Sequence, residues 1–184
     1  MVRLAVSLLG FLLAACAVVV PTPARPSASP APTTDPSIAA LERPFALPTY
    51  LAGCQQSVAH YVLPGVADGL GPGPVWPIGL EPPGASLGAS TDGVWHAVKV
   101  LWAADPSYVG PILVRGGRID APGAMRFSLD GGATQTKELY IPAGGPDPRE
   151  QGWPSFTYLQ TVGCYAYQID GSGFSYSVVF DIKT

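Results

Sequence analysis

The chain has 184 residues and a formal net charge of −3, and only 12% of its residues are charged, about half the usual globular share. Its 22 glycines and 21 prolines disfavour a helical protein, and the slightly acidic balance excludes a basic nucleic-acid-binding domain. Because 47% of the residues are hydrophobic and 10% aromatic, the chain is not a highly charged disordered protein. Length and composition therefore predict one all-β domain with additional segments.

The chain begins with an apolar leader. Arg3 supplies one positive charge, and an apolar run over residues 4–15 follows it, as in a secretory signal peptide. Pro21 stops the wider apolar stretch over residues 4–20. That stretch is short for a membrane-spanning helix, which needs about 20 apolar residues. The leader therefore predicts export from the cytoplasm.

The leader ends in a short motif, Leu13-Ala14-Ala15-Cys16. This motif resembles the lipobox of bacterial lipoproteins. The resemblance implies that residues 1–15 are a signal peptide removed by cleavage, and that Cys16 becomes an acylated N-terminus. Two or three acyl chains would then hold the protein on the outer side of the cell membrane. A plain signal peptide, or a single-span anchor that happens to contain a cysteine, stays an alternative.

The segment that follows has the composition of a tether. Pro, Ala, Ser and Thr occupy 19 of the 28 positions from 17 to 44, and no apolar period follows Val20. Such a stretch cannot bury enough apolar surface to fold by itself. We expect residues 16–44 to be a disordered, lipidated tether and residues 45–184 to be the folded domain.

The domain shows the period-2 pattern of β-strands. Apolar side chains occupy every second position over 174–182 and over 165–169, and Asp170-Gly171-Ser172-Gly173 between them predicts a hairpin turn. Five further runs predict strands over 94–102, 111–115, 125–129, 136–141 and 156–162. Short strands at this spacing predict a single antiparallel, immunoglobulin-like β-sandwich. Residues 64–92, rich in Pro and Gly, predict a long irregular excursion.

The three cysteines have two predicted roles, one in lipidation and two in a disulfide. With Cys16 assigned to lipid, Cys54 and Cys164 remain, and an oxidising compartment favours a disulfide between them. This bridge would tie the start of the domain to its penultimate strand. It would also leave no cysteine for a Cys–His catalytic pair.

The stretch from Trp95 onward carries a second resemblance. Its residues include Lys99–Trp102, Tyr108–Gly116, Trp153–Ser155, Gly163–Tyr165 and Val178–Phe180. The stretch is similar to a recurring domain in uncharacterised bacterial secreted lipoproteins. The shared motifs are structural, so the resemblance implies no particular activity.

Few residues point to catalysis. His60 and His96 are the only histidines, whereas a zinc site needs three or four convergent ligands. Capping and turn roles suit the carboxylates that lie near turn signals, which are Asp105, Asp120, Asp130, Asp147, Glu150 and Asp170. The sequence therefore predicts no catalytic residue, no metal site and no cofactor.

Aromatic residues are the remaining candidates for binding. Trp76, Tyr108 and Trp153 lie close to Pro or Gly, and aromatic side chains on rigid loops stack on sugars or anchor proteins; alternatively, they fill the ends of the sandwich. We expect an extracytoplasmic lipoprotein that binds or scaffolds an envelope polysaccharide or protein, with no nucleic acid as partner. An envelope hydrolase and a lipoprotein that binds a small molecule or metal stay alternatives.

Overall fold

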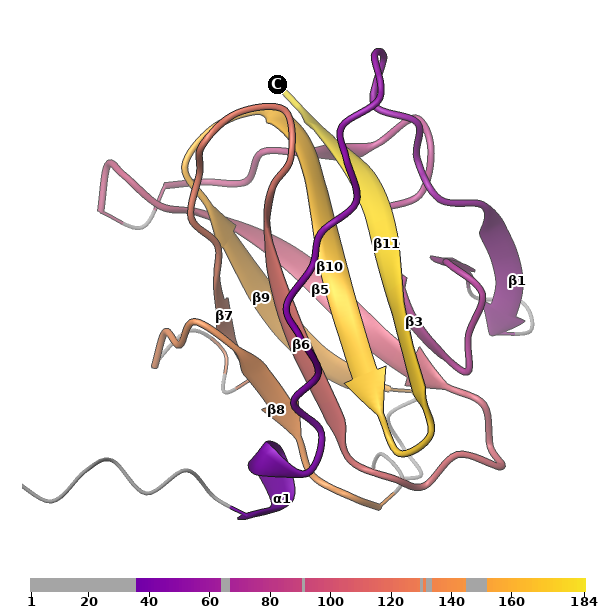
Figure 1. Cartoon of the computed structure of the whole chain (residues 1–184). Coiled ribbons are helices and arrows are strands. Elements are labelled where there is room, and N and C mark those ends of the chain that lie inside the picture. The colour runs from indigo at the N-terminus through magenta and orange to yellow at the C-terminus, as the bar shows by residue number, and fades with distance from the viewer. Residues whose placement is uncertain (1–35, 64–66, 91, 130, 132–133, 145–151) are drawn as a thin grey trace, which may run out of the picture. The chain divides into compact units, whose positions relative to one another are not determined.

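The structure is a computed structural model (Figure 1). It describes residues 36–63, 67–90, 92–129, 131, 134–144 and 152–184. The predicted signal peptide over 1–15, the acylation of Cys16 and most of the tether lie outside the described residues, and they stay predictions. Within the described ranges, α1 (Pro36–Ala39) is a single short turn, and no helix there has both the length and the apolarity needed to cross a membrane.

The described residues form an all-β fold, as the composition predicts. Its strands are β1 (Ala59–Leu63), β2 (Ala67–Leu70), β3 (Val75–Ile78), β4 (Ala85–Ser86), β5 (His96–Ala104), β6 (Ile112–Arg118), β7 (Arg126–Ser128), β8 (Leu139–Ile141), β9 (Trp153–Leu159), β10 (Gly163–Gly171) and β11 (Phe174–Lys183). The last seven strands, β5 to β11, match the seven predicted runs in order, with ends that differ by a few residues.

In the described part of the chain, the strands form three sheets. The larger sheet has the order β4-β11-β10-β6-β8, the second has the order β3-β5-β9-β7, and β1 and β2 pair as a separate ribbon. The two larger sheets share one hydrophobic core. At its centre, the ring of Tyr167 on β10 lies 5.3 Å from that of Trp102 on β5 and 6.0 Å from that of Phe127 on β7.

The alternation predicted for the C-terminal hairpin has a clear structural basis. Val178, Phe180 and Ile182 on β11 are buried in the core, and residues between them are more exposed. The neighbouring strand differs, because β10 is buried on both of its faces. One face meets the core, and a second segment of the chain covers the other.

That covering segment is the strap, residues 41–57, which crosses the outer face of the larger sheet in front of β6 and β10 (Figure 1). Leu41 is buried, and the carbonyl oxygens of Arg43 and Pro44 accept hydrogen bonds from side chains of the sheet. The packed part of the chain therefore begins N-terminal to the predicted boundary at residue 45, because backbone polar groups of the strap find partners on the sheet.

Two predictions about the sheets are wrong. The predicted excursion over 64–92 contains β2, β3 and β4. Pro77 lies within β3, an edge strand, where a missing N–H is tolerated, and it hides the strand pattern. The sheets are also not purely antiparallel, because β4 pairs with β11 in parallel. Gly84 allows this approach, since a Cβ there would lie 2.7 Å from the carbonyl oxygen of Asp181.

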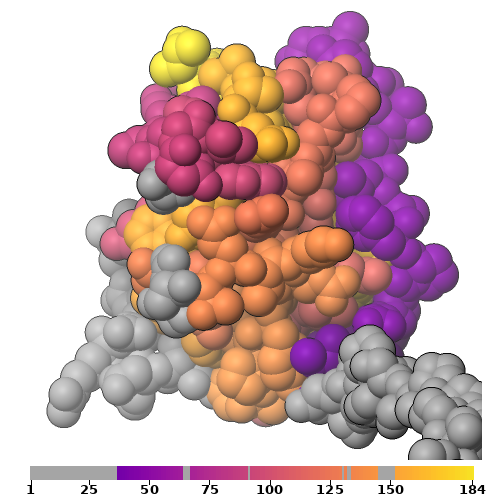
Figure 2. Space-filling view, turned by 90° about the vertical axis from the view of Figure 1, so that its left-hand side faces the viewer, coloured from indigo at the N-terminus to yellow at the C-terminus, as the bar shows by residue number. Residues whose placement is uncertain are grey.

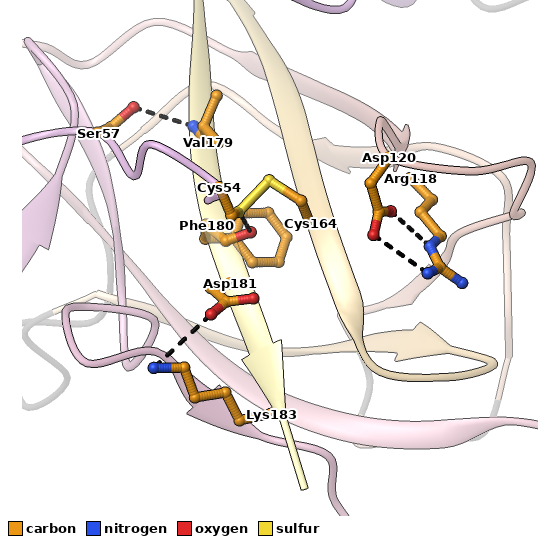
Figure 3. The surroundings of a disulfide bond; sticks show 9 residues. All are labelled: Cys54, Ser57, Arg118, Asp120, Cys164, Val179, Phe180, Asp181 and Lys183. Carbon is orange, nitrogen blue, oxygen red and sulfur yellow. Dashed lines mark hydrogen bonds and ion pairs between the residues drawn. A yellow bond between two sulfur atoms is a disulfide. The ribbon is translucent and has the colours of Figure 1, made fainter. Parts of the chain in front are cut away.

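The predicted disulfide between Cys54 and Cys164 is confirmed, and it joins the strap to β10, the penultimate strand (Figure 3). Cys164 lies on the face of β10 opposite to the core residue Tyr165. The bridge therefore fastens the strap to the outside of the larger sheet, unlike the bridge between sheets of antibody domains. Beside it, Ser57 exchanges two hydrogen bonds of 2.9 Å with the backbone of Val179.

Candidate ligand-binding site

A buried polar network lies between the strap and the larger sheet. The side chain of Asp170 on β10 is 0% exposed, and that of Arg115 on β6 is 12% exposed. Arg115 Nη2 donates to Asp170 Oδ2 at 2.6 Å, and Ser175 Oγ donates to Asp170 Oδ1 at 2.6 Å. A buried carboxylate needs such partners because its desolvation is expensive. The network therefore fixes the position of the Arg115 guanidinium.

The same network holds the strap in place. Arg115 Nη2 also donates to the carbonyl oxygen of Arg43 at 2.7 Å. Gln168 on β10 accepts a hydrogen bond from the backbone N–H of Ala46 at 2.8 Å and donates to the carbonyl oxygen of Pro44 at 3.2 Å. Residues 43–46 are thus anchored by side chains that lie more than 70 positions away in the sequence.

Beside this anchored segment lies a cavity of about 380 Å³, which we call the strap cavity. Its lining includes Phe45 from the strap, Arg115 from β6, Met125 and Arg126 at the start of β7, and Lys137 and Glu138 just before β8. Figure 2 shows the strap, in purple, beside the coral and orange segments that carry these strands. A volume near 400 Å³ is in the range that small-molecule sites occupy.

The two arginine side chains of the strap cavity lie against aromatic rings. Arg115 Cζ lies 5.4 Å from the centre of the Phe45 ring, and Arg126 Cζ lies 4.3 Å from that of Trp95. Trp95 is positioned in turn by Asp92 Oδ1, which accepts its backbone N–H at 2.8 Å. That hydrogen bond and a second one from the N–H of Val94 lower the pKa of Asp92. The rings leave the two guanidinium groups charged and oriented.

A second cavity of about 550 Å³ adjoins the first, and Lys137 and Glu138 line both. Its other walls include Ile38 of α1 and the side chains of Thr136 and Tyr140. Tyr140 Oη donates to Ser37 Oγ at 3.1 Å. A ligand longer than the strap cavity could therefore continue along β8 past hydroxyl groups.

The aromatic residues that the sequence singled out lie elsewhere. Trp76 is half-buried on β3, and its Nε1 donates to the carbonyl oxygen of Gly71 at 3.1 Å. Trp153 and Tyr108 pack against the core. Tyr108 Oη donates to the carbonyl oxygen of Pro111 at 2.6 Å. Their predicted role in binding stays a prediction, but none of the three lines the strap cavity.

The titratable residues that the sequence considered for catalysis are separated. His60 is exposed on β1, and His96 is half-buried on β5 with its Nδ1 2.9 Å from the carbonyl oxygen of Gly88. Asp120 pairs with Arg118, whose hydrogen bonds lower the pKa of that carboxyl group (Figure 3). Among the residues with described positions, no three His, Cys, Asp or Glu side chains gather as metal ligands would.

Sequence reasoning missed the strap cavity. Its lining comes from Phe45, Arg115, Met125 and the pair Lys137–Glu138, and no local pattern connects these segments. One weak signal exists, since Lys137 and Glu138 are adjacent charges in a chain with few charged residues. The sequence also does not reveal that the strap covers the second face of β10, because this follows from the packing of distant segments.

Comparison with known proteins adds no support to either resemblance seen in the sequence. The motif that resembles a lipobox ends at Cys16, which lies outside the described residues, and the resemblance from Trp95 onward concerns structural motifs only. Both resemblances rest on the sequence alone, because the chain matches no family model, no curated protein and no solved structure.

Proposed function

We propose that this chain is a bacterial lipoprotein, anchored outside the cytoplasm through acylated Cys16, whose β domain binds a small molecule in the strap cavity. The proposal combines the location expected from the leader with a site that the sequence did not reveal. It narrows the wider expectation of a binding or scaffolding module for an envelope polysaccharide or protein.

The disulfide supports the location. A bridge between Cys54 and Cys164 is favoured in compartments that are oxidising, and it would be reduced in most cytosols. Cys16 is then the one cysteine outside the bridge, as a lipidated N-terminus requires. The strap begins within the last residues of the predicted tether, so the segment that supplies Phe45 to the strap cavity leads on directly from the proposed membrane anchor.

The observation that carries the binding function is the composition of the strap cavity. Apolar surface from Phe45 and Met125 lies beside fixed polar groups such as Arg115. Ligand sites typically combine mostly apolar walls with a few oriented polar groups. For the fold, we propose an immunoglobulin-like sandwich, supported by the core that the two larger sheets share.

Membrane fractionation and mass spectrometry test the location. In a bacterial host, we expect the full chain in the membrane fraction, with a diacylglyceryl group on the N-terminal peptide that begins at Cys16. Cys16→Ala should lose both the lipid and the membrane association, and Ser29→Ala in the tether should keep both. An N-terminal peptide with a free thiol at Cys16 would overturn the proposed anchor.

Equilibrium dialysis tests the binding function. The lipidated full chain in detergent is dialysed against a small-molecule extract of the cell envelope, and retained compounds are identified by mass spectrometry. We expect at least one enriched compound, which Ala124→Trp should release because Ala124 lines the strap cavity. Ala89→Trp places the same ring at another exposed position and should keep the compound. If no compound is enriched, or if Ala124→Trp and Ala89→Trp lose the compound equally, the proposed site is overturned.

A further inference from the structure

We propose that the strap cavity takes an organic oxyanion, a carboxylate or phosphate attached to a ring or short apolar group. This inference rests on the proposed binding function and specifies its ligand class. It is carried by the arrangement of three cationic side chains around one apolar floor.

The first argument is the concentration of positive charge. Arg115, Arg126 and Lys137, three of the chain's ten basic residues, line this single cavity, although the chain as a whole is acidic. Glu138 is the one acidic residue in its lining. Clefts lined by one sign of charge attract ligands of the opposite sign.

The second argument is that Arg115 has donors to spare. Its Nη2 donates both to Asp170 and to the carbonyl oxygen of Arg43. Nε has no acceptor within the described part of the chain, but it is buried, so the nitrogen that a ligand in the strap cavity would contact is Nη1. A guanidinium held on one side by a carboxylate is preorganised to donate from its other nitrogens to an oxyanion.

The third argument concerns the two cations near the protein surface. Arg126 is exposed and stacks on Trp95. Lys137 is also exposed and forms no ion pair with any residue of the described ranges. Both cations remain accessible to a ligand, although Arg126 also donates to Gln135 Oε1 at 3.4 Å and interacts with the Asp92 carboxylate. The charge of Arg115 is partly balanced by Asp170.

The apolar part of the ligand follows from the floor and the strap. Met125 is buried, and Phe45 is 52% exposed although its ring lies against the Arg115 guanidinium. A flat or short apolar group on the ligand could cover this ring and remove its surface from water. An oxyanion alone would leave that surface exposed.

Titration calorimetry on the lipidated full chain in detergent tests the inference with defined probes. Phenyl phosphate and benzoate should bind, inorganic phosphate should bind at least tenfold more weakly, and phenol should not bind measurably. Arg126→Gln and Lys137→Gln should each weaken the binding of phenyl phosphate about fivefold, the size expected for one exposed charge contact. Glu138→Gln should tighten the binding of phenyl phosphate about two- to fivefold, because it removes a negative charge that repels the phosphate. Whichever of phenyl phosphate and benzoate binds more tightly identifies the preferred oxyanion.

A matched control separates local from general charge effects. Lys99 is exposed on β5 and does not line the strap cavity, so Lys99→Gln should leave phenyl phosphate binding unchanged. Equal effects of Lys99→Gln and Lys137→Gln, weaker binding by Glu138→Gln, or binding of phenol as tight as that of phenyl phosphate would each overturn the oxyanion site. A neutral or cationic compound retained in the dialysis experiment and lost with Ala124→Trp would overturn this inference while leaving the binding function intact.

Discussion

The ion pair between Arg115 and Asp170 should be essential for stability, and its removal gives a prediction that can be worked out from the structure. Asp170 is fully buried and accepts hydrogen bonds from Arg115, Ser175 and Gln168 over distances of 2.6 to 3.2 Å. Asp170→Asn removes the charge that balances Arg115 and turns one acceptor oxygen into a donor. Breaking a buried pair by removing one partner typically costs about 3–5 kcal/mol.

A double-mutant cycle measured by urea denaturation checks this value. Asp170→Asn and Arg115→Met should each lower the free energy of unfolding by about 3–5 kcal/mol, because each leaves one buried charge without its partner. The double variant, Asp170→Asn with Arg115→Met, should lose much less unfolding free energy than the sum of the two single losses, since no buried charge remains. We therefore expect a coupling energy of at least about 2 kcal/mol.

Asp120→Asn is the matched control, because it breaks the pair with Arg118, whose side chains are 19% and 21% exposed. A loss of about 1 kcal/mol or less is expected there at neutral pH. Pairing lowers the pKa of Asp120, so its contribution is complete above the ordinary carboxyl pKa of about 4 and disappears as the pH falls through the lowered value. Equal losses for Asp170→Asn and Asp120→Asn at neutral pH would refute the idea that the strap buries a stabilising pair.

Two further predictions concern the strap and the wall of the cavity. Cys54→Ser with Cys164→Ser opens a loop of 110 residues and should lower the unfolding free energy by about 4–5 kcal/mol, and a urea titration giving a loss below about 1 kcal/mol would contradict this. Gly116→Ala should cost about 1–3 kcal/mol by overpacking, because its Cβ would lie 2.8 Å from the carbonyl oxygen of Ala166. In Gly117→Ala the Cβ would lie 3.2 Å from the end of the Leu47 side chain and 3.8 Å from the carbonyl oxygen of Gly123, so this variant should change stability little. Equal losses of the two variants in thermal denaturation would refute the difference.

The strands of the C-terminal half could be predicted because their cause is local. In Phe174–Lys183 every second side chain faces the core, and this alternation can be seen in the order of consecutive residues. The disulfide could also be predicted, since assigning Cys16 to lipid leaves two cysteines. The strand Val75–Ile78 could not, because its glycine and proline neighbours resemble a loop and its place at a sheet edge depends on its partner.

The sequence by itself determined the all-β class, the C-terminal hairpin and the pairing of Cys54 with Cys164, because alternation and cysteine number do not depend on how distant segments meet. Only the tertiary structure decided that the strap covers Gln168 and Asp170 on β10, and that Phe45 and Lys137 line one cavity. The physical reason is that a local pattern records which face of a strand avoids water. It does not record which distant segment supplies the cover, since that depends on backbone hydrogen bonds and charges brought together by the packing of the sheets.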